Sequence, residues 1–183
     1  MKKLLGALFL LWLFNGLTVA STHAKAEDAE MKVGQIAPDF SLPDQSGKPR
    51  ALADYRQRWV VLYFYPKDDT PGCTKEACQF RDNFLAIRNL GAEILGISVD
   101  SQESHAKFSG KYNLPFPLLA DTEGHVAKQY GALRSLALIR FARRHTFILD
   151  PQGKIAKIYR EVDPEIHSQE VITDLKALQG ATS

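Results

Sequence analysis

The chain has 183 residues, of which 45% are hydrophobic, and a length and composition of this kind are typical of one domain with a sizeable core. Of its 23 basic residues, 3 lie in residues 1–26, which hold no acid, so 20 basic and 21 acidic residues remain and the net charge of the rest is near −1. A nearly neutral chain without a cluster of basic and aromatic residues is not expected to bind nucleic acid.

The first 26 residues have the pattern of an export signal. Two lysines precede an apolar run over residues 4–20, and Ala24-Lys25-Ala26 matches the small-residue pattern of a cleavage site. We therefore expect export, in a bacterium to the periplasm, with cleavage before Glu27 and a single domain over residues 27–183. Thr18-Val19-Ala20 offers a second cleavage site. An uncleaved leader would instead anchor the protein to a membrane.

Apolar patterns and turn residues predict the secondary structure of this domain. The expected strands are Asp39–Leu42 and Pro49–Leu52 around a turn, then Trp59–Tyr65, Glu93–Val99, Pro117–Ala120, His145–Leu149 and Lys154–Tyr159. The expected helices are Pro71–Leu90, Gln102–Tyr112, Val126–Tyr130 and Ile166–Leu178. Near-continuous apolar strands suit the centre of a sheet covered on both faces. The order predicts an α/β fold with a mixed central sheet and helices on both faces.

Both cysteines lie in the stretch Pro66–Cys78, between an expected strand and an expected helix. Thr70 suits the N-cap and Pro71 the first helical position, so Cys73 falls in the first helical turn. Unpaired N–H groups and the helix dipole favour an anion there. The position therefore favours the thiolate, which is the nucleophilic form of cysteine.

The helical pattern separates the two cysteines. An apolar stripe is formed by Ala77, Phe80, Phe84 and Ile87. Cys73 falls within this stripe, whereas Cys78 lies about 140° from its centre and is expected to face solvent. Their Cα atoms are expected to be about 8 to 9 Å apart, and a disulfide needs less than about 7 Å. A bond requires the first turns to unwind, which favours a redox cycle over a permanent disulfide.

At this point the sequence resembles a known family. The pattern Pro66-x-x-x-Thr70-x-x-Cys73 resembles the active-site motif of the peroxiredoxins. The longer string from Phe64 to Cys78 resembles their bacterioferritin comigratory protein (PrxQ) branch, which has a second cysteine five residues on. The likeness runs from about Val33 to the C-terminal helix. It implies a thioredoxin-like fold and a thiol-dependent peroxidase for hydrogen peroxide and organic hydroperoxides.

The resemblance also implies roles for single residues. Cys73 would attack the peroxide and become a sulfenic acid, which Cys78 would resolve as an intramolecular disulfide. Thr70 and Arg144 would stabilise the charge on the attacked oxygen, although Thr70 can also be read as a helix cap only. Arg143 is expected to point the other way along its strand. A thioredoxin-like dithiol protein would be the reductant, no cofactor or metal is implied, and a self-contained cysteine pair suits a monomer.

Two other functions stay open at this stage. A general thiol–disulfide oxidoreductase would share the fold, but its cysteines are typically spaced C-x-x-C and not C-x-x-x-x-C as here. A non-catalytic periplasmic binding domain with a structural disulfide is the second. The segment Arg134–Arg144 mixes four arginines with apolar residues. We expect a loop or short helix packed beside the active site, and a membrane-surface or partner-docking patch is the alternative.

Overall fold

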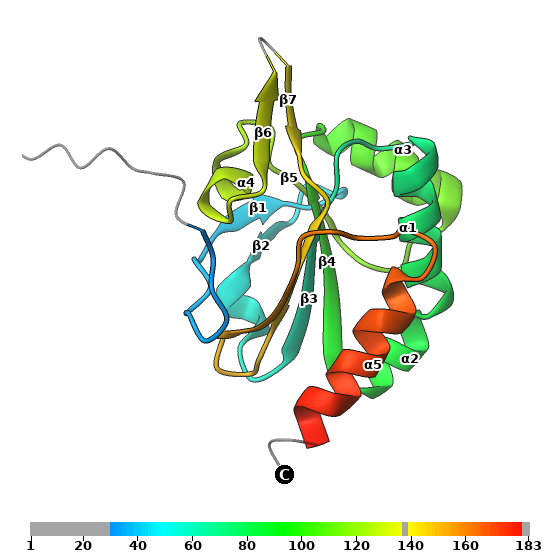
Figure 1. The fold of residues 1–183 in the computed structure, drawn as a ribbon. Helices are drawn as coiled ribbons and strands as arrows, with labels where there is room; N and C mark the ends of the chain where they lie inside the picture. Colours follow the sequence, from blue (N-terminus) through cyan, green and yellow to red (C-terminus); the bar gives the residue numbers. More distant parts are fainter. Residues whose placement is uncertain (1–29, 137–138, 181–183) are drawn as a thin grey trace, which may run out of the picture.

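The computed structural model describes residues 30–136 and 139–180, shown as the coloured ribbon in Figure 1. The expected leader and its cleavage sites lie outside these residues. Among the helices that the structure describes, none is long and apolar enough to cross a bilayer.

A five-stranded mixed sheet forms the centre of the fold, in the order β5-β4-β3-β8-β9. These strands are β3 (Trp59–Phe64), β4 (Ala92–Ser98), β5 (Leu118–Ala120), β8 (His145–Leu149) and β9 (Ile155–Tyr159). The central strand β3 runs parallel to β4, with Val61 opposite Ile94, and antiparallel to β8, with Val61 opposite Ile148. The expected mixed sheet is confirmed, and each of its strands lies within two residues of the predicted bounds.

The remaining elements cover this sheet or extend from it. The helices are η1 (Leu52–Tyr55), α1 (Pro71–Asp82), α2 (Phe84–Asn89), α3 (Gln102–Tyr112), α4 (His125–Gln129) and α5 (His167–Gly180). Two separate hairpins pair β1 (Ser41–Pro43) with β2 (Pro49–Ala51), and β6 (Leu133–Leu136) with β7 (Ile139–Ala142).

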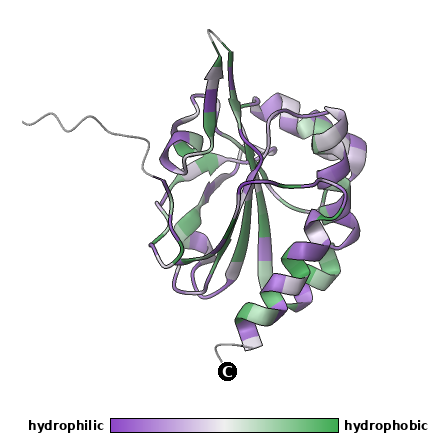
Figure 2. Cartoon of the chain, viewed as in Figure 1, coloured by the Kyte–Doolittle hydropathy of each residue, from purple (hydrophilic) through white to green (hydrophobic). Residues whose placement is uncertain are grey.

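Alternate residues of β3 enter two different cores, as the pleat of a strand requires. Val60, Leu62 and Phe64 pack in the core that α4 and η1 cover. Val61 and Tyr63 pack in the core that α1, α2, α3 and α5 cover. Figure 2 shows the hydrophobic central strands between these two layers. The sheet therefore has helices on both faces, as predicted, and Cys73 belongs to the larger helical layer.

Two predictions about secondary structure are wrong. The helix expected over 71–90 is interrupted at Asn83, where the Gln79 carbonyl accepts hydrogen bonds from both the Asn83 backbone N–H at 3.1 Å and the Asn83 side-chain amide at 3.0 Å. The segment Arg134–Arg144, expected to be a loop or short helix, forms most of the β6–β7 hairpin, which projects from the molecule in Figure 1. Most described residues of this hairpin are exposed, so its strands bury little apolar surface.

Candidate active site

Cys73 is buried in the first turn of α1, with 2% of its surface exposed. Thr70 is the N-cap residue and Pro71 the first helical residue, as predicted. A Cβ atom at Gly72 would lie 3.3 Å from the Arg144 Nη2 atom, which is tighter than most real contacts. Glycine at this position therefore lets the guanidinium approach the helix start.

Arg144 joins the thiol to a buried carboxyl group. Its Nη2 atom lies 3.4 Å from the Cys73 Sγ atom, and its Nη1 atom donates to the Glu76 Oε2 atom. Arg144 directly precedes β8, and it is Arg144 rather than the adjacent Arg143 that contacts Cys73. The guanidinium thus holds a positive charge beside the sulfur, where it stabilises a thiolate.

Glu76 is the main site residue that sequence reasoning missed. It lies three residues after Cys73 on the buried side of α1, and it is 1% exposed. Burial raises the Glu76 pKa from 4.5 to about 7 against the opposing effect of Arg144. Burial by itself would lower the Arg144 pKa, but Glu76 and Cys73 raise it. The sequence offered one signal for Glu76: an acidic residue on the apolar face of an expected helix, where a buried charge needs a partner.

Thr70 stands where a helix cap was expected, but its hydroxyl makes a different bond. It donates to the Lys67 carbonyl at 3.0 Å, and it forms no capping bond to the helix. Thr70 is therefore the N-cap residue by position, but its side chain does not cap the helix. The bond instead closes the loop that leads into α1.

Cys78 lies on the same helix as Cys73, and both thiols are free. We expected Cys78 to face solvent, and the structure finds it half-buried. The continuous helix over 71–82 keeps the two cysteines five residues apart on different sides. In this state they cannot bond, because helical geometry separates their Cα atoms by more than a disulfide spans.

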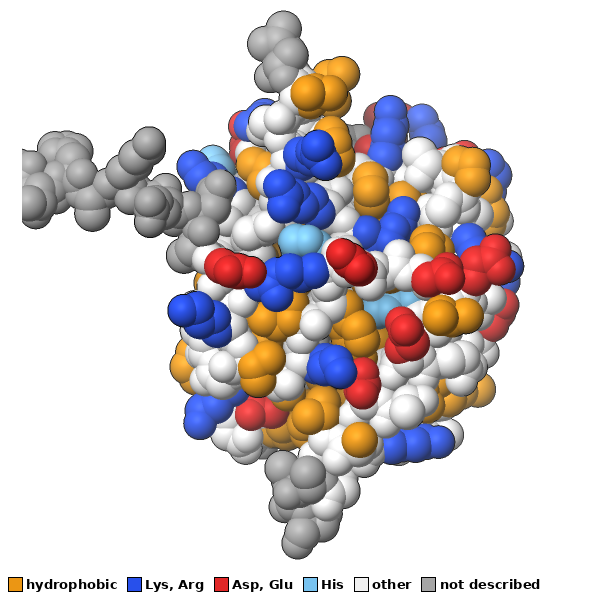
Figure 3. Space-filling model, viewed as in Figure 1, with side chains coloured by type: hydrophobic (Ala, Val, Ile, Leu, Met, Phe, Trp, Pro, Cys, Tyr) orange, Lys and Arg blue, Asp and Glu red, His pale blue; other side chains and the backbone are white. Residues whose placement is uncertain are grey.

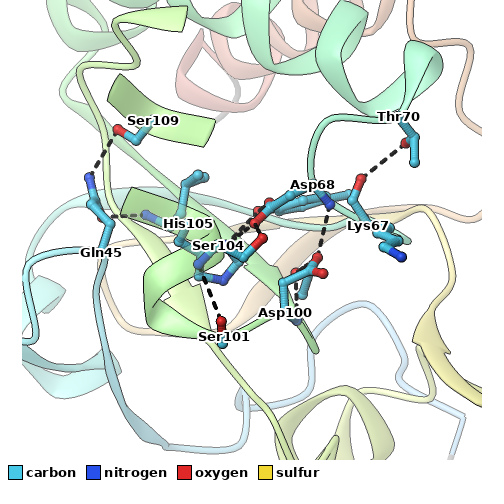
Figure 4. Close-up of polar contacts among 12 residues, drawn as sticks. Gln45, Lys67, Asp68, Thr70, Asp100, Ser101, Ser104, His105 and Ser109 are labelled. Carbon is cyan, nitrogen blue, oxygen red and sulfur yellow. Dashed lines mark hydrogen bonds and ion pairs between the residues drawn. The ribbon is translucent and has the colours of Figure 1, made fainter. Parts of the chain in front are cut away.

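A buried polar cluster anchors the loop before α1, and Figure 4 shows it. The Asp68 carboxylate accepts hydrogen bonds from the Tyr65 hydroxyl and the Ser104 hydroxyl, both at 2.7 Å, and contacts His105 Nδ1 at 2.9 Å. The Asp68 backbone N–H donates to the Asp100 carboxylate at 2.9 Å. Sequence reasoning assigned no chemistry to His105, because a lone histidine gives no signal of such a partner.

The next residue ties the same loop to the other end of α3. Asp69 has a left-handed backbone, with φ of 56°, which is unfavourable for a residue other than glycine. Its carboxylate accepts bonds from Lys111 Nζ at 2.7 Å and from the Tyr112 hydroxyl at 2.7 Å. The loop that presents Cys73 is therefore fixed to α3 at two points.

Residues 33–158 match the AhpC/TSA family. The chain is 44% identical over 148 residues to the putative peroxiredoxin bcp of Coxiella burnetii, covering 78% of this chain and 97% of that protein. Its fold is similar to the crystal structure of peroxidoxin BcpB from Mycobacterium tuberculosis, with a TM-score of 0.77, 39% identity and coverage of 81% and 98%.

A second solved structure is that of the Xanthomonas campestris bacterioferritin comigratory protein, described for its alkyl peroxide reduction activity. The TM-score is 0.74 at 32% identity, with 80% of this chain and 96% of that chain covered.

Proposed function

The chain belongs to the AhpC/TSA family and is a thiol-dependent peroxidase of the peroxiredoxin Q/Bcp kind, and we propose that Cys73 is the sulfur that attacks the peroxide. The observation that carries this assignment is the Arg144 guanidinium 3.4 Å from the Cys73 Sγ atom at a helix start. The alternative of a general thiol–disulfide oxidoreductase is not favoured by the relatives of this chain.

In the proposed reaction the Cys73 thiolate attacks one oxygen of the peroxide. The O–O bond breaks, the sulfur gives up two electrons and becomes a sulfenic acid, and the other oxygen leaves with a proton as water or an alcohol. The Arg144 guanidinium and the first-turn N–H groups of Gly72 and Cys73 stabilise the negative charge on the leaving oxygen. Pro66, which is half-buried beside the site, limits access of water to the sulfur.

Thr70 is the least direct member of this proposal. Its hydroxyl donates to the Lys67 carbonyl, so its oxygen still has lone pairs to offer but its proton is occupied. To donate to the peroxide, the hydroxyl must exchange that bond for one to the substrate, by rotation of its O–H about the Cβ–Oγ1 bond. We propose that this rotation accompanies peroxide binding.

We further propose that Cys78 resolves the sulfenic acid. Its thiolate attacks the Cys73 sulfur, water leaves, and an intramolecular disulfide forms after the start of α1 unwinds. A dithiol protein of the thioredoxin type then reduces the disulfide with two electrons and two protons. This cycle needs no cofactor, and because both cysteines belong to one chain it operates in a monomer.

The decisive experiment is peroxide consumption by the purified chain with a dithiol donor. We expect turnover with wild type, one disulfide per chain after one equivalent of peroxide, and no turnover with Cys73→Ser. Insulin reduction without peroxide consumption would instead support the hypothesis of a general thiol–disulfide oxidoreductase. Formation of the disulfide between chains would contradict the monomeric cycle.

For location we propose export to a bacterial periplasm, with removal of residues 1–26. The support is the lysine pair, the apolar run and Ala24-Lys25-Ala26 in the sequence. An exported enzyme requires a thioredoxin-like donor in the same compartment. Terminal sequencing of the protein from its native cell should begin near Glu27, and a cytosolic product starting at Met1 would exclude export.

A further inference from the structure

His105 is a buried histidine that the proposed reaction does not use. Histidine side chains are visible on the surface in Figure 3, but His105 is 0% exposed. It lies in α3 and not in the helix that carries Cys73. A buried polar side chain is costly unless it is hydrogen-bonded, so its bonding partners indicate its role.

One nitrogen of the His105 ring has hydrogen-bond partners among residues 30–136 and 139–180, and the other has none. The Nδ1 atom lies 2.9 Å from the Asp68 Oδ2 atom and 3.3 Å from the Tyr65 hydroxyl oxygen. The Nε2 atom is buried and has no hydrogen bond to these residues. Because a carboxylate only accepts hydrogen bonds, Nδ1 carries the proton and donates to Asp68. This bond joins α3 to the loop before α1, as Figure 4 shows.

Asp68 connects this bond to the residues around the proposed reaction. Its Oδ2 atom also accepts from the Ser104 hydroxyl, and its Oδ1 atom accepts from the Tyr65 hydroxyl, both at 2.7 Å. The residue before it, Lys67, supplies the carbonyl that accepts from the Thr70 hydroxyl. The Asp68 side chain is 4% exposed, so solvent does little to replace a hydrogen bond that is lost there.

The loop needs such bonds because its conformation is unfavourable by itself. Asp69 has a φ of 56°, which costs free energy in a residue other than glycine and persists only where the surroundings hold it. The Thr70 hydroxyl and the first-turn N–H groups follow directly, and such donors stabilise a leaving oxygen only when they are aimed at it. A displacement of about 1 Å can lower a reaction rate about a hundredfold.

We propose that His105 is a positioning residue for the oxidation of Cys73. Its Nδ1–H bond to Asp68 holds the loop 66–70 in the conformation that aims the start of α1 at the peroxide. The inference rests on the proposed role of Cys73 as the sulfur that attacks peroxide. Among the described residues, the ring nitrogens bond to Asp68 and Tyr65 and not to this sulfur, so His105 acts through the loop and not on the reacting atoms.

The test separates the two nitrogens of the ring. Asparagine places an amide donor near the position of Nδ1, whereas glutamine places one near the position of Nε2. In stopped-flow assays with hydrogen peroxide, we expect His105→Asn to be oxidised within about threefold of the wild-type rate. His105→Gln should be about tenfold slower or more, because the Asp68 carboxylate loses a buried donor and the loop moves.

Two serine variants keep the proposal testable if His105→Gln does not fold. Ser104→Ala removes a half-buried hydroxyl that donates to the same Asp68 oxygen, and it should slow oxidation about threefold. Ser101→Ala is the matched control, because the Ser101 hydroxyl caps α3 by accepting from the Ser104 N–H at 3.2 Å. Among the described contacts it makes no bond to the loop, so its loss weakens the same helix but should leave the oxidation rate unchanged.

Alkylation of Cys73 by iodoacetamide, followed by peptide mass spectrometry, measures the thiolate without peroxide. This reaction needs no donor for a leaving oxygen, so its rate should not fall in any of these variants. A parallel fall in alkylation would mean that His105 acts on the thiolate itself, and it would overturn the positioning role. If wild-type Cys73 is alkylated but does not react with peroxide, the proposed function is refuted, and this inference with it.

Urea unfolding of each reduced variant separates positioning from stability. If His105 only stabilised the fold, the oxidation rates would follow the free energies of unfolding, and Ser101→Ala would be slowed with the others. Rates in that order, or equal rates for His105→Asn and His105→Gln, would overturn the proposal. Oxidation that is retained by asparagine and lost with glutamine, with Ser101→Ala at the wild-type rate, would support it.

Discussion

Replacing Glu76 by glutamine should remove a pH dependence of stability that the buried carboxyl imposes. The native Glu76 pKa is about 7, compared with an ordinary value of 4.5. The folded state therefore binds more protons than the unfolded state across this interval, and its free energy of unfolding falls as the pH rises. Between pH 5 and pH 8 this loss amounts to about 2 to 3 kcal/mol, at about 1.4 kcal/mol for each pKa unit.

Glutamine has the shape of the protonated acid and keeps an oxygen for Arg144, but it does not ionise. The two reduced proteins should be similarly stable at pH 5, and Glu76→Gln should be the more stable one at pH 8. Urea unfolding at both pH values measures this double difference, and other titrating groups, such as His145 and His167, cancel from it. An equal difference at the two pH values would refute the argument that Glu76 carries a raised pKa in the native state.

Three other changes test separate parts of the site. Arg144→Ala should slow the oxidation of Cys73 by hydrogen peroxide at least a hundredfold in stopped-flow assays, since losing one oxyanion donor costs about that much. Arg140→Ala should not slow it, and similar losses in the two variants would contradict a role for Arg144 in the mechanism. Cys78→Ser should consume one peroxide per chain and then stop, and mass spectrometry should show Cys73 as the sulfenic acid. Normal turnover of this variant would contradict the role of Cys78 as the resolving cysteine. Asp68→Asn should lower the free energy of unfolding by about 2 to 4 kcal/mol, because hydroxyl donors lose a buried carboxylate. Asp69→Asn, at an exposed position, should lower the free energy of unfolding by less. Equal losses in the two variants would argue against Asp68 as a buried anchor of the loop.

The sequence predicted the sheet and the helix start because their signals are local. Trp59 to Phe64 is a nearly unbroken apolar run that suits a central strand. Thr70 and Pro71 mark the beginning of a helix, and this places Cys73 in the first turn. The pairing of Arg144 with this turn came from resemblance to a family, since no local pattern joins residues 71 positions apart.

The missed features depend on contacts between distant parts of the chain. Asp68 and His105 look like ordinary polar residues until β3 and α3 are packed together. The β6–β7 hairpin was missed because its strands pair mainly with one another and bury little apolar surface. Glu76 was missed because an acid in an amphipathic helix is usually exposed, and only the position of Arg144 explains why this one is not.

The anchors around α1 show how one helix can serve two steps with different structural demands. In the proposed cycle, attack on peroxide requires Cys73 to stay beside Arg144, whereas resolution by Cys78 requires the turns up to Cys78 to unwind. The preceding loop is fixed through Asp68, so the unwinding can begin after this anchor without moving the strand behind it. On the other side, the helix is already interrupted at Asn83, so the disturbance need not pass into α2. The segment that must change is thereby confined to about two turns, which keeps the cost of each cycle to a few backbone hydrogen bonds and the exposure of a small part of the core.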